Sequence, residues 1–101
     1  MPRLRVELAP QALLDLEDIA DFIARDNPNA ALRWVDRLVD CAQRVGALPR
    51  SGRVVPEIGD PNIREVRLRT YRIIYRIEAR RVLVLTVIEG HRRLRPDLRK
   101  R

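Results

Sequence analysis

Cysteine, histidine and long apolar runs are scarce in this sequence, and each scarcity narrows what the chain can be. Cys41 is the only cysteine among 101 residues, so no disulfide can form within the chain. The acidic residues between Asp15 and Asp21 have no histidine or cysteine beside them, so we expect no metal site there. No apolar run approaches the ~18 residues of a membrane span, and the N-terminus has no signal-peptide core. We therefore expect a single cytoplasmic domain over residues 1–101, without cofactor, metal or membrane partner.

Positive charge is abundant and unevenly placed. The chain is 46% hydrophobic and 35% charged, as expected of a globular domain, and its net charge is +7. Residues 1–49 carry six arginines against eight acidic residues, a balance of −2, whereas residues 50–101 carry fifteen basic against six acidic residues, a balance of +9. Nearly all the basic residues are arginines, whose planar guanidinium binds phosphate or carboxylate. The clustering predicts an anionic partner, either nucleic acid or an acidic protein segment.

The N-terminal half has the pattern of one strand followed by two helices. Residues 3–8 alternate apolar and charged side chains, which predicts a half-buried strand. Pro10 suits the first turn of a helix, and Asn27 with Pro28 suits the start of a second one that ends at Gly46. So short a connection predicts a helical hairpin, with one apolar face on each helix to be covered by a sheet. We expect the acidic run of the first helix to be solvated.

The C-terminal half predicts an ordered loop at residues 49–61 and then a three-stranded antiparallel meander. Its strands are expected at 63–69, 71–77 and 82–88, where β-branched and aromatic residues dominate. The last run is apolar on both faces, so we expect it to be buried, with the N-terminal strand beside it. The helices would cover one face of this sheet. The other face would be shallow, concave and bordered by arginines.

Several phrases in this order carry a resemblance to a known family. They are DNPNAALRW, LPRSGR, IREVRLRTYRIIYRI and VLVLTVIEGHRR. Their order and spacing resemble the RelE/ParE superfamily of bacterial toxins. The resemblance implies an α+β fold, in which an N-terminal strand, a helical hairpin and the meander form one mostly antiparallel sheet, followed by a basic tail at about 94–101. It also implies a cognate antitoxin with an acidic, partly disordered C-terminal segment. One branch of the superfamily cleaves messenger RNA on the ribosome, and the other poisons DNA gyrase.

The nuclease branch implies catalytic roles for three residues. Arg72, His91 and Arg92 match positions that this branch uses to stabilise charge on the phosphate and to transfer protons. The tyrosine that several of these nucleases carry near the C-terminus has no counterpart, because Leu98 stands in its place. Lys100 is the only lysine, whereas the best-known nucleases have a lysine-rich segment. We therefore favour the ParE-like branch, with ribosome-dependent messenger RNA cleavage as the alternative.

The ParE-like branch implies binding roles instead. Arg69 and Arg93 would contact the target, DNA gyrase or nucleic acid, while Arg64 and Arg76 would contact the antitoxin. Salt bridges to the acids of the sheet are an alternative for Arg72 and Arg76. A member that only binds its antitoxin is a third possibility.

Overall fold

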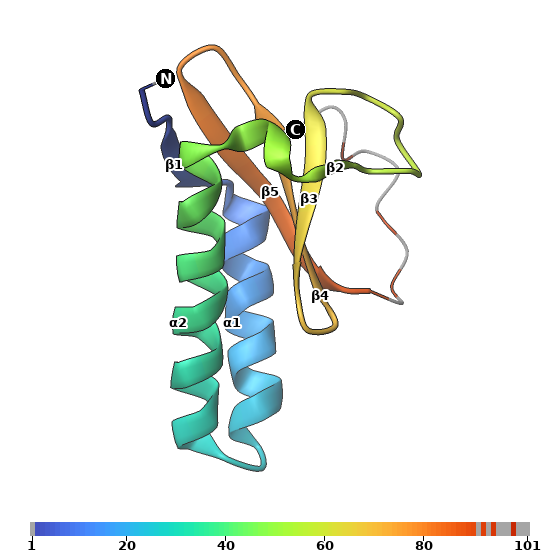
Figure 1. The fold of residues 1–101 in the computed structure, drawn as a ribbon. Helices are drawn as coiled ribbons and strands as arrows, with labels where there is room; N and C mark the ends of the chain where they lie inside the picture. Colours follow the sequence, from blue (N-terminus) through green and yellow to red (C-terminus); the bar gives the residue numbers. More distant parts are fainter. Residues whose placement is uncertain (1, 91, 93, 95–97, 99–101) are drawn as a thin grey trace.

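A helical hairpin packed on a five-stranded sheet makes up the part of the protein that the structure, a computed structural model, describes: residues 2–90, 92, 94 and 98 (Figure 1). The elements in chain order are β1 (Arg5–Leu8), α1 (Pro10–Ala24), α2 (Pro28–Arg44), two 3-10 turns (Val45–Ala47 and Pro49–Ser51), β2 (Arg53–Val54), β3 (Ile63–Leu68), β4 (Tyr71–Ile77) and β5 (Arg81–Glu89). No helix of this described part is long and apolar enough to cross a bilayer.

The sheet has the strand order β1-β5-β4-β3-β2. β1 pairs with β5 in parallel, and every other pair is antiparallel, which confirms the predicted α+β class with its mostly antiparallel sheet. β2 was not predicted, because its two residues lie inside a segment rich in proline and glycine. They pair with Arg64 and Glu65 of β3. The predicted loop therefore begins and ends against the sheet.

The helical hairpin starts at the residues that the sequence indicated. Pro10 and Pro28 each open a helix, and the side chain of Asn27 accepts a hydrogen bond from the Ala30 amide at 3.1 Å. α2 ends at Arg44, and a 3-10 turn continues it to Ala47. Gly46 lies in that turn, where a Cβ atom would collide with the Leu4 carbonyl. Glycine is needed here for the close approach of the two backbones.

Each face of the sheet carries a buried apolar cluster, which the sequence did not indicate for the face opposite the helices. One cluster packs the helices onto one face through Leu16, Leu38, Ile73, Tyr75 and other residues. A second cluster covers the opposite face, and its buried members are Ala9, Val55, Ile63, Ile74, Leu83, Leu85 and Leu98. Leu98 is only 2% exposed. Apolar residues from the loop after β2 and from beyond β5 therefore cover the face opposite the helices.

Asp15 is a second correction, because it is not part of a solvated acidic face. β1 ends at Leu8 opposite Val84, so β5 continues past it with one edge free of a partner strand among the described residues. The Asp15 carboxylate fills part of this edge. It accepts the Val87 amide at 3.0 Å, the Thr86 hydroxyl, and the Gln11 side-chain amide at 2.8 Å. An acidic side chain of α1 thus satisfies the strand backbone that β1 leaves uncovered.

Candidate functional site

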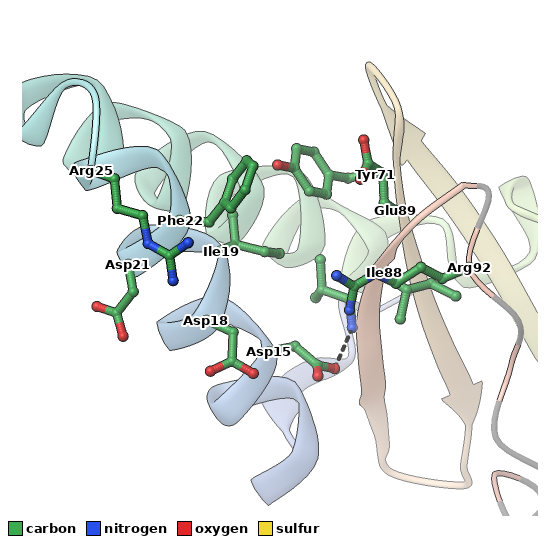
Figure 2. A pocket seen from close by; sticks show the side chains of 11 residues that line it. Asp15, Asp18, Ile19, Asp21, Phe22, Arg25, Tyr71, Ile88, Glu89 and Arg92 are labelled. Atoms are coloured by element: carbon green, nitrogen blue, oxygen red, sulfur yellow. Dashed lines mark hydrogen bonds between the residues drawn. The ribbon is translucent and has the colours of Figure 1, made fainter.

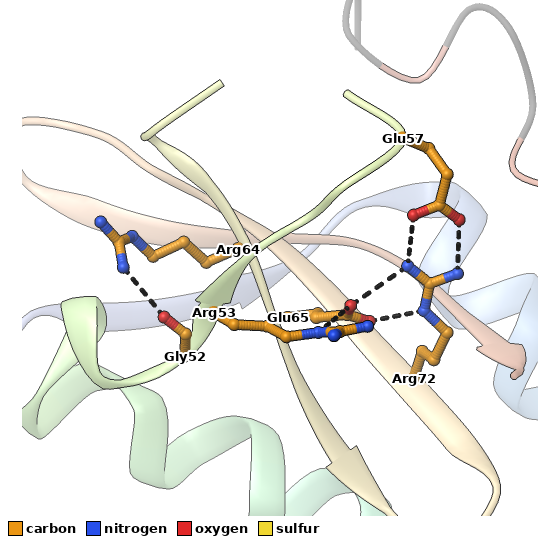
Figure 3. Close-up of polar contacts among 6 residues, drawn as sticks. All are labelled: Gly52, Arg53, Glu57, Arg64, Glu65 and Arg72. Carbon is orange, nitrogen blue, oxygen red and sulfur yellow. Dashed lines mark hydrogen bonds and ion pairs between the residues drawn. The ribbon is translucent and has the colours of Figure 1, made fainter. Parts of the chain in front are cut away.

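Arg72 lies at the centre of a cluster of charged side chains on the sheet face opposite the helices (Figure 3). Its guanidinium donates to Glu65 at 2.5 and 3.2 Å and to Glu57 at 2.8 and 3.0 Å. The Arg72 side chain is only 4% exposed. The hydrogen bonds that Arg72 donates to Glu57, and then to Glu65, hold the pKa of Arg72 above its ordinary value against the effect of burial. A phosphate could reach this guanidinium only after Glu57 had moved away.

Glu65 is the buried acid that joins two arginines in this cluster. Its side chain is fully buried, and Arg53 donates to it at 2.7 Å in addition to Arg72. Burial alone would raise the pKa of Glu65, but the hydrogen bonds from Arg72 and Arg53 outweigh burial and lower it. The carboxylate therefore stays charged and paired. Hydrogen bonds from Arg72 also lower the pKa of Glu57 in the loop after β2.

Arg64 points to the helix side of β3 and holds the segment before β2. Its guanidinium donates to three backbone carbonyls, those of Arg50, Gly52 and Pro61, at 3.1, 2.9 and 2.9 Å. The Tyr75 hydroxyl donates to the Pro49 carbonyl at 2.6 Å, and a Cβ atom on Gly52 would collide with that hydroxyl. These contacts give the LPRSGR phrase a structural explanation: it forms a tight turn fixed by Arg64 and Tyr75.

Arg76 belongs to a chain of ion pairs at the other end of β4. Glu78 accepts from Arg76 at 2.8 Å and from Arg81 at 2.6 Å, and Arg81 in turn donates to Glu7 at 2.6 Å. Glu7 also pairs with Arg5 at 2.6 Å. The chain connects β1 with the β4–β5 hairpin. For Arg72 and Arg76 alike, the arrangement found is the salt bridging that the sequence left open as an alternative.

Arg69 and Arg92 are the predicted site residues that remain exposed. Arg69 lies in the β3–β4 turn with a φ of 56°, and it forms no ion pair with any described residue. The Gly90 amide donates to the Thr70 carbonyl, so this turn lies beside the end of β5 (Figure 1). Arg92 lines the same groove as Tyr71, the first residue after the turn (Figure 2). Arg67 of β3 is also exposed, and its guanidinium lies against Gly90. His91 and Arg93 lie outside the described residues.

The predicted site residues that the structure describes lie in separate places. Arg72, Arg64 and Arg76 are engaged with acids or carbonyls, while Arg69 and Arg92 are exposed at one end of the sheet.

Comparison with known proteins decides the family. The chain matches the sequence profile described as the ParE toxin of a type II toxin-antitoxin system, parDE, over residues 6–94. The chain belongs to this ParE toxin family. It is also 36% identical over 96 residues to Y4kP of Sinorhizobium fredii (strain NBRC 101917 / NGR234), named as a candidate toxin, with 90% of this chain and 93% of that one covered.

Two solved structures share the fold of this ParE-family toxin. A chain of the chromosomal ParDE system from P. aeruginosa has a TM-score of 0.73 at 19% identity, covering 86% of this chain and 96% of that one. A chain of the RelBE2 toxin-antitoxin complex from Mycobacterium tuberculosis has a TM-score of 0.66 at 23% identity, covering 88% and 93%. At such identities the likeness extends to the fold alone.

Sequence reasoning missed four residues of the arginine clusters in this family member. The sequence indicated no role for Glu57, Arg53, Glu65 or Arg67. Strand alternation places Glu65 on the same face as Ile63, which is buried, and this was the available signal that Glu65 needs a buried partner.

Proposed function

We propose that this toxin inhibits growth by binding DNA gyrase through exposed arginines at the Arg69 end of the sheet, and that a cognate antitoxin neutralises it. Membership of the ParE family supports the general role. The guanidinium of Arg72 is already paired with two carboxylates and is not free to bind a phosphate. This pairing favours inhibition by contact with a protein target over cleavage of RNA.

Arg69 carries the proposal for the target-binding end. A residue with a side chain at φ 56° is uncommon and costs of order 1 kcal/mol, and glycine would remove this cost. Arg69 nevertheless lies there, exposed and without an ion pair to any described residue. Strained residues of this kind concentrate at functional sites. Arg92 is exposed beyond the adjacent end of β5, so both arginines can meet one partner surface.

Ribosome-dependent cleavage of messenger RNA is the alternative function. The exposed guanidinium of Arg92 favours it, because a phosphate could reach that group directly. Arg72 would have to exchange Glu57 for the phosphate during each reaction. The predicted roles of His91 in catalysis and of Arg93 in target binding stay proposals.

The antitoxin is proposed to place an acidic, partly disordered C-terminal segment on the basic half of the toxin. Exposed arginines without an ion pair to described residues, such as Arg67 and Arg50, offer guanidinium groups for its carboxylates. Leu48 is 69% exposed beside Arg50 and offers apolar surface. Arg64 and Arg76 are also proposed to contact the antitoxin, each from the position in which its hydrogen bonds hold it.

The test of the target-binding end is a double substitution with a matched control. We expect the double variant Arg69→Ala, Arg92→Ala to require more than ten times as much toxin for the same growth inhibition. Thermal stability should change little, because neither side chain pairs with described residues. The control, Arg33→Ala with Arg80→Ala, removes two exposed arginines elsewhere and should keep full toxicity. Equal toxicity of both double variants would contradict the proposed binding end.

A further inference from the structure

Three exposed arginines lie along the outer edge of the sheet, where β3 and β2 are the last strands (Figure 1). β2 has only two residues, so β3 is the outermost described strand beyond them. Arg53 lies opposite Glu65, Arg67 is two residues further along β3, and Arg69 follows in the β3–β4 turn. Because a strand rises about 3.3 Å per residue, Arg67 lies roughly 7 Å further along the edge than Arg53. We call Arg53, Arg67 and Arg69 the arginine row.

The surface between the first two arginines of the row is hollowed. A hollow of about 450 Å³ is lined by Arg53 and Arg67 together with Ser51, Gly52, Glu65 and Val66. Glu65 is the only acid in this lining, and its fully buried carboxylate already accepts from Arg53 at 2.7 Å. The Arg53 side chain is nevertheless 57% exposed, and Arg67 is exposed without an ion pair to any described residue. An anion in the hollow would therefore meet guanidinium groups from two sides.

The acids beside the row compensate only part of its positive charge. Arg67 lies directly opposite Arg72 of β4, and like charges in such positions destabilise a sheet. Glu57 and Glu65 neutralise Arg72, whereas the Arg67 guanidinium extends to Gly90, where a Cβ atom would lie 3.3 Å from its Nη1. With Arg72 included, four arginines face these two carboxylates, a balance of +2. A bound anion would remove the repulsion that the fold leaves uncompensated here.

The described residues along the row expose no large apolar side chain. The large apolar residues that the described part of the chain exposes lie on the two helices and in the connection after α2: Leu13, Leu14, Phe22, Leu32 and Leu48. Interfaces between proteins bury apolar or aromatic side chains at their centre, whereas nucleic-acid phosphates are bound through cationic groups. Guanidinium groups without apolar surface therefore favour a nucleic-acid backbone over a protein surface as the occupant.

We propose that the arginine row binds the sugar-phosphate backbone of the DNA that gyrase holds. The inference rests on the proposed action on gyrase, and it names the part of the gyrase–DNA complex that the Arg69 end contacts. Arg53 and Arg67 would hold a phosphate between the two walls of the hollow, and Arg69 would reach a neighbouring phosphate from the turn. Phosphate contacts carry no sequence information, so any DNA sequence should serve. Because Arg67 is also open to the acidic segment of the antitoxin, DNA and antitoxin would exclude each other there.

The experiment compares the affinity of the toxin for gyrase alone with its affinity for gyrase loaded on a linear DNA duplex, by fluorescence anisotropy of labelled toxin. The test variant is Arg67→Gln with Arg69→Gln. The control, Arg33→Gln with Arg80→Gln, removes the same charge from exposed positions elsewhere. We expect DNA to tighten binding of the wild type and the control about tenfold at low salt, and this gain to fall by roughly 0.9 log unit per log unit of salt for each phosphate contact.

The test variant should lose the gain that DNA gives and bind gyrase alone as the wild type does. Circular dichroism verifies the folding of each variant, and each single substitution should lose part of the gain, so the test does not depend on the double variant. An equal loss on gyrase with and without DNA would overturn the inference, because the arginines would then contact gyrase itself, and the proposed function would stand. A gain that the test variant keeps, or a wild-type affinity that DNA does not change, would also overturn it. Wild-type toxin that binds gyrase in neither form would contradict the proposed function as well.

Discussion

Glu65 is the residue on which the charged cluster depends. Its side chain is fully buried and accepts hydrogen bonds from Arg72 and Arg53. Removing one partner of a buried ion pair is costly, about 3–5 kcal/mol, because the remaining charge loses its compensation. Arg72 would keep Glu57 as a partner, so the lower end of that range applies.

We expect Glu65→Ala to lower the free energy of unfolding by about 3 kcal/mol. Urea denaturation at pH 7 measures the change. Glu17→Ala is the control, because Glu17 is exposed on α1 and should change stability by less than about 0.5 kcal/mol. A loss below 1 kcal/mol for Glu65→Ala would show that the cluster does not hold the fold together.

Glu57 predicts a dependence of stability on pH. Hydrogen bonds from Arg72 lower the pKa of Glu57 in the folded state below the ordinary 4.5. A carboxylate with a lowered folded pKa stabilises the protein at pH values above its unfolded pKa, and this contribution is lost as the pH falls through the folded pKa. Glu57→Gln should therefore be less stable than the wild type at pH 7, and this difference should shrink in acid. Denaturation of both proteins at pH 7 and pH 3 measures it; a constant difference would argue against the ion pair.

Among the secondary-structure elements, helix α1 covers the edge of β5 that has no partner strand in the described part of the chain. β1 pairs with β5 only as far as Val84, and α1 supplies Asp15 to the amide of Val87 beyond that point. Exposed strand edges invite pairing with other chains, and a charged side chain directed at the edge discourages it.

We expect Asp15→Ala to destabilise the protein by about 1–3 kcal/mol, because a buried amide and a hydroxyl lose their acceptor. Amide hydrogen exchange should accelerate at Val87 more than at Val84, which is paired with Leu8 of β1. Asp18→Ala is the matched control from the next turn of α1, and it should leave both amides unchanged. Unchanged exchange at Val87 in Asp15→Ala would show that Asp15 does not protect the edge.

Local signals explain which elements were predictable. Pro10, Asn27 and Pro28 mark the first turns of the two helices through local effects. The strands are marked by the alternation of apolar and polar residues within each run. Both kinds of element can therefore be located from the sequence. β2 could not be predicted in this way. Its two residues are strand only because β3 lies beside them, and tertiary pairing overrides the loop character of the surrounding prolines.

On the scale of the whole molecule, the charges are distributed differently from what the totals suggested. The sheet half holds the excess positive charge, but much of it is neutralised within two networks centred on Arg72 and Arg81. Arg67, Arg69 and Arg92 are exposed at one end of the sheet, and Arg50 and Arg80 are exposed elsewhere. The partner acids could not be assigned from sequence, because Glu57 is fifteen residues from Arg72 and meets it only when the loop folds over the sheet. Leu98, beyond β5, packs on that same face, and no local sequence pattern predicts this contact.

The central claim is that this ParE-family toxin acts on DNA gyrase by contact, and a supercoiling reaction tests it most directly. Toxin freed of antitoxin is mixed with gyrase, ATP and plasmid, beside the Arg69→Ala, Arg92→Ala variant. We predict that the wild type blocks supercoiling and traps linear DNA, and that the variant does neither. Normal supercoiling with a preparation that still arrests growth, together with cleavage of ribosome-bound messenger RNA, would contradict the claim and favour the nuclease.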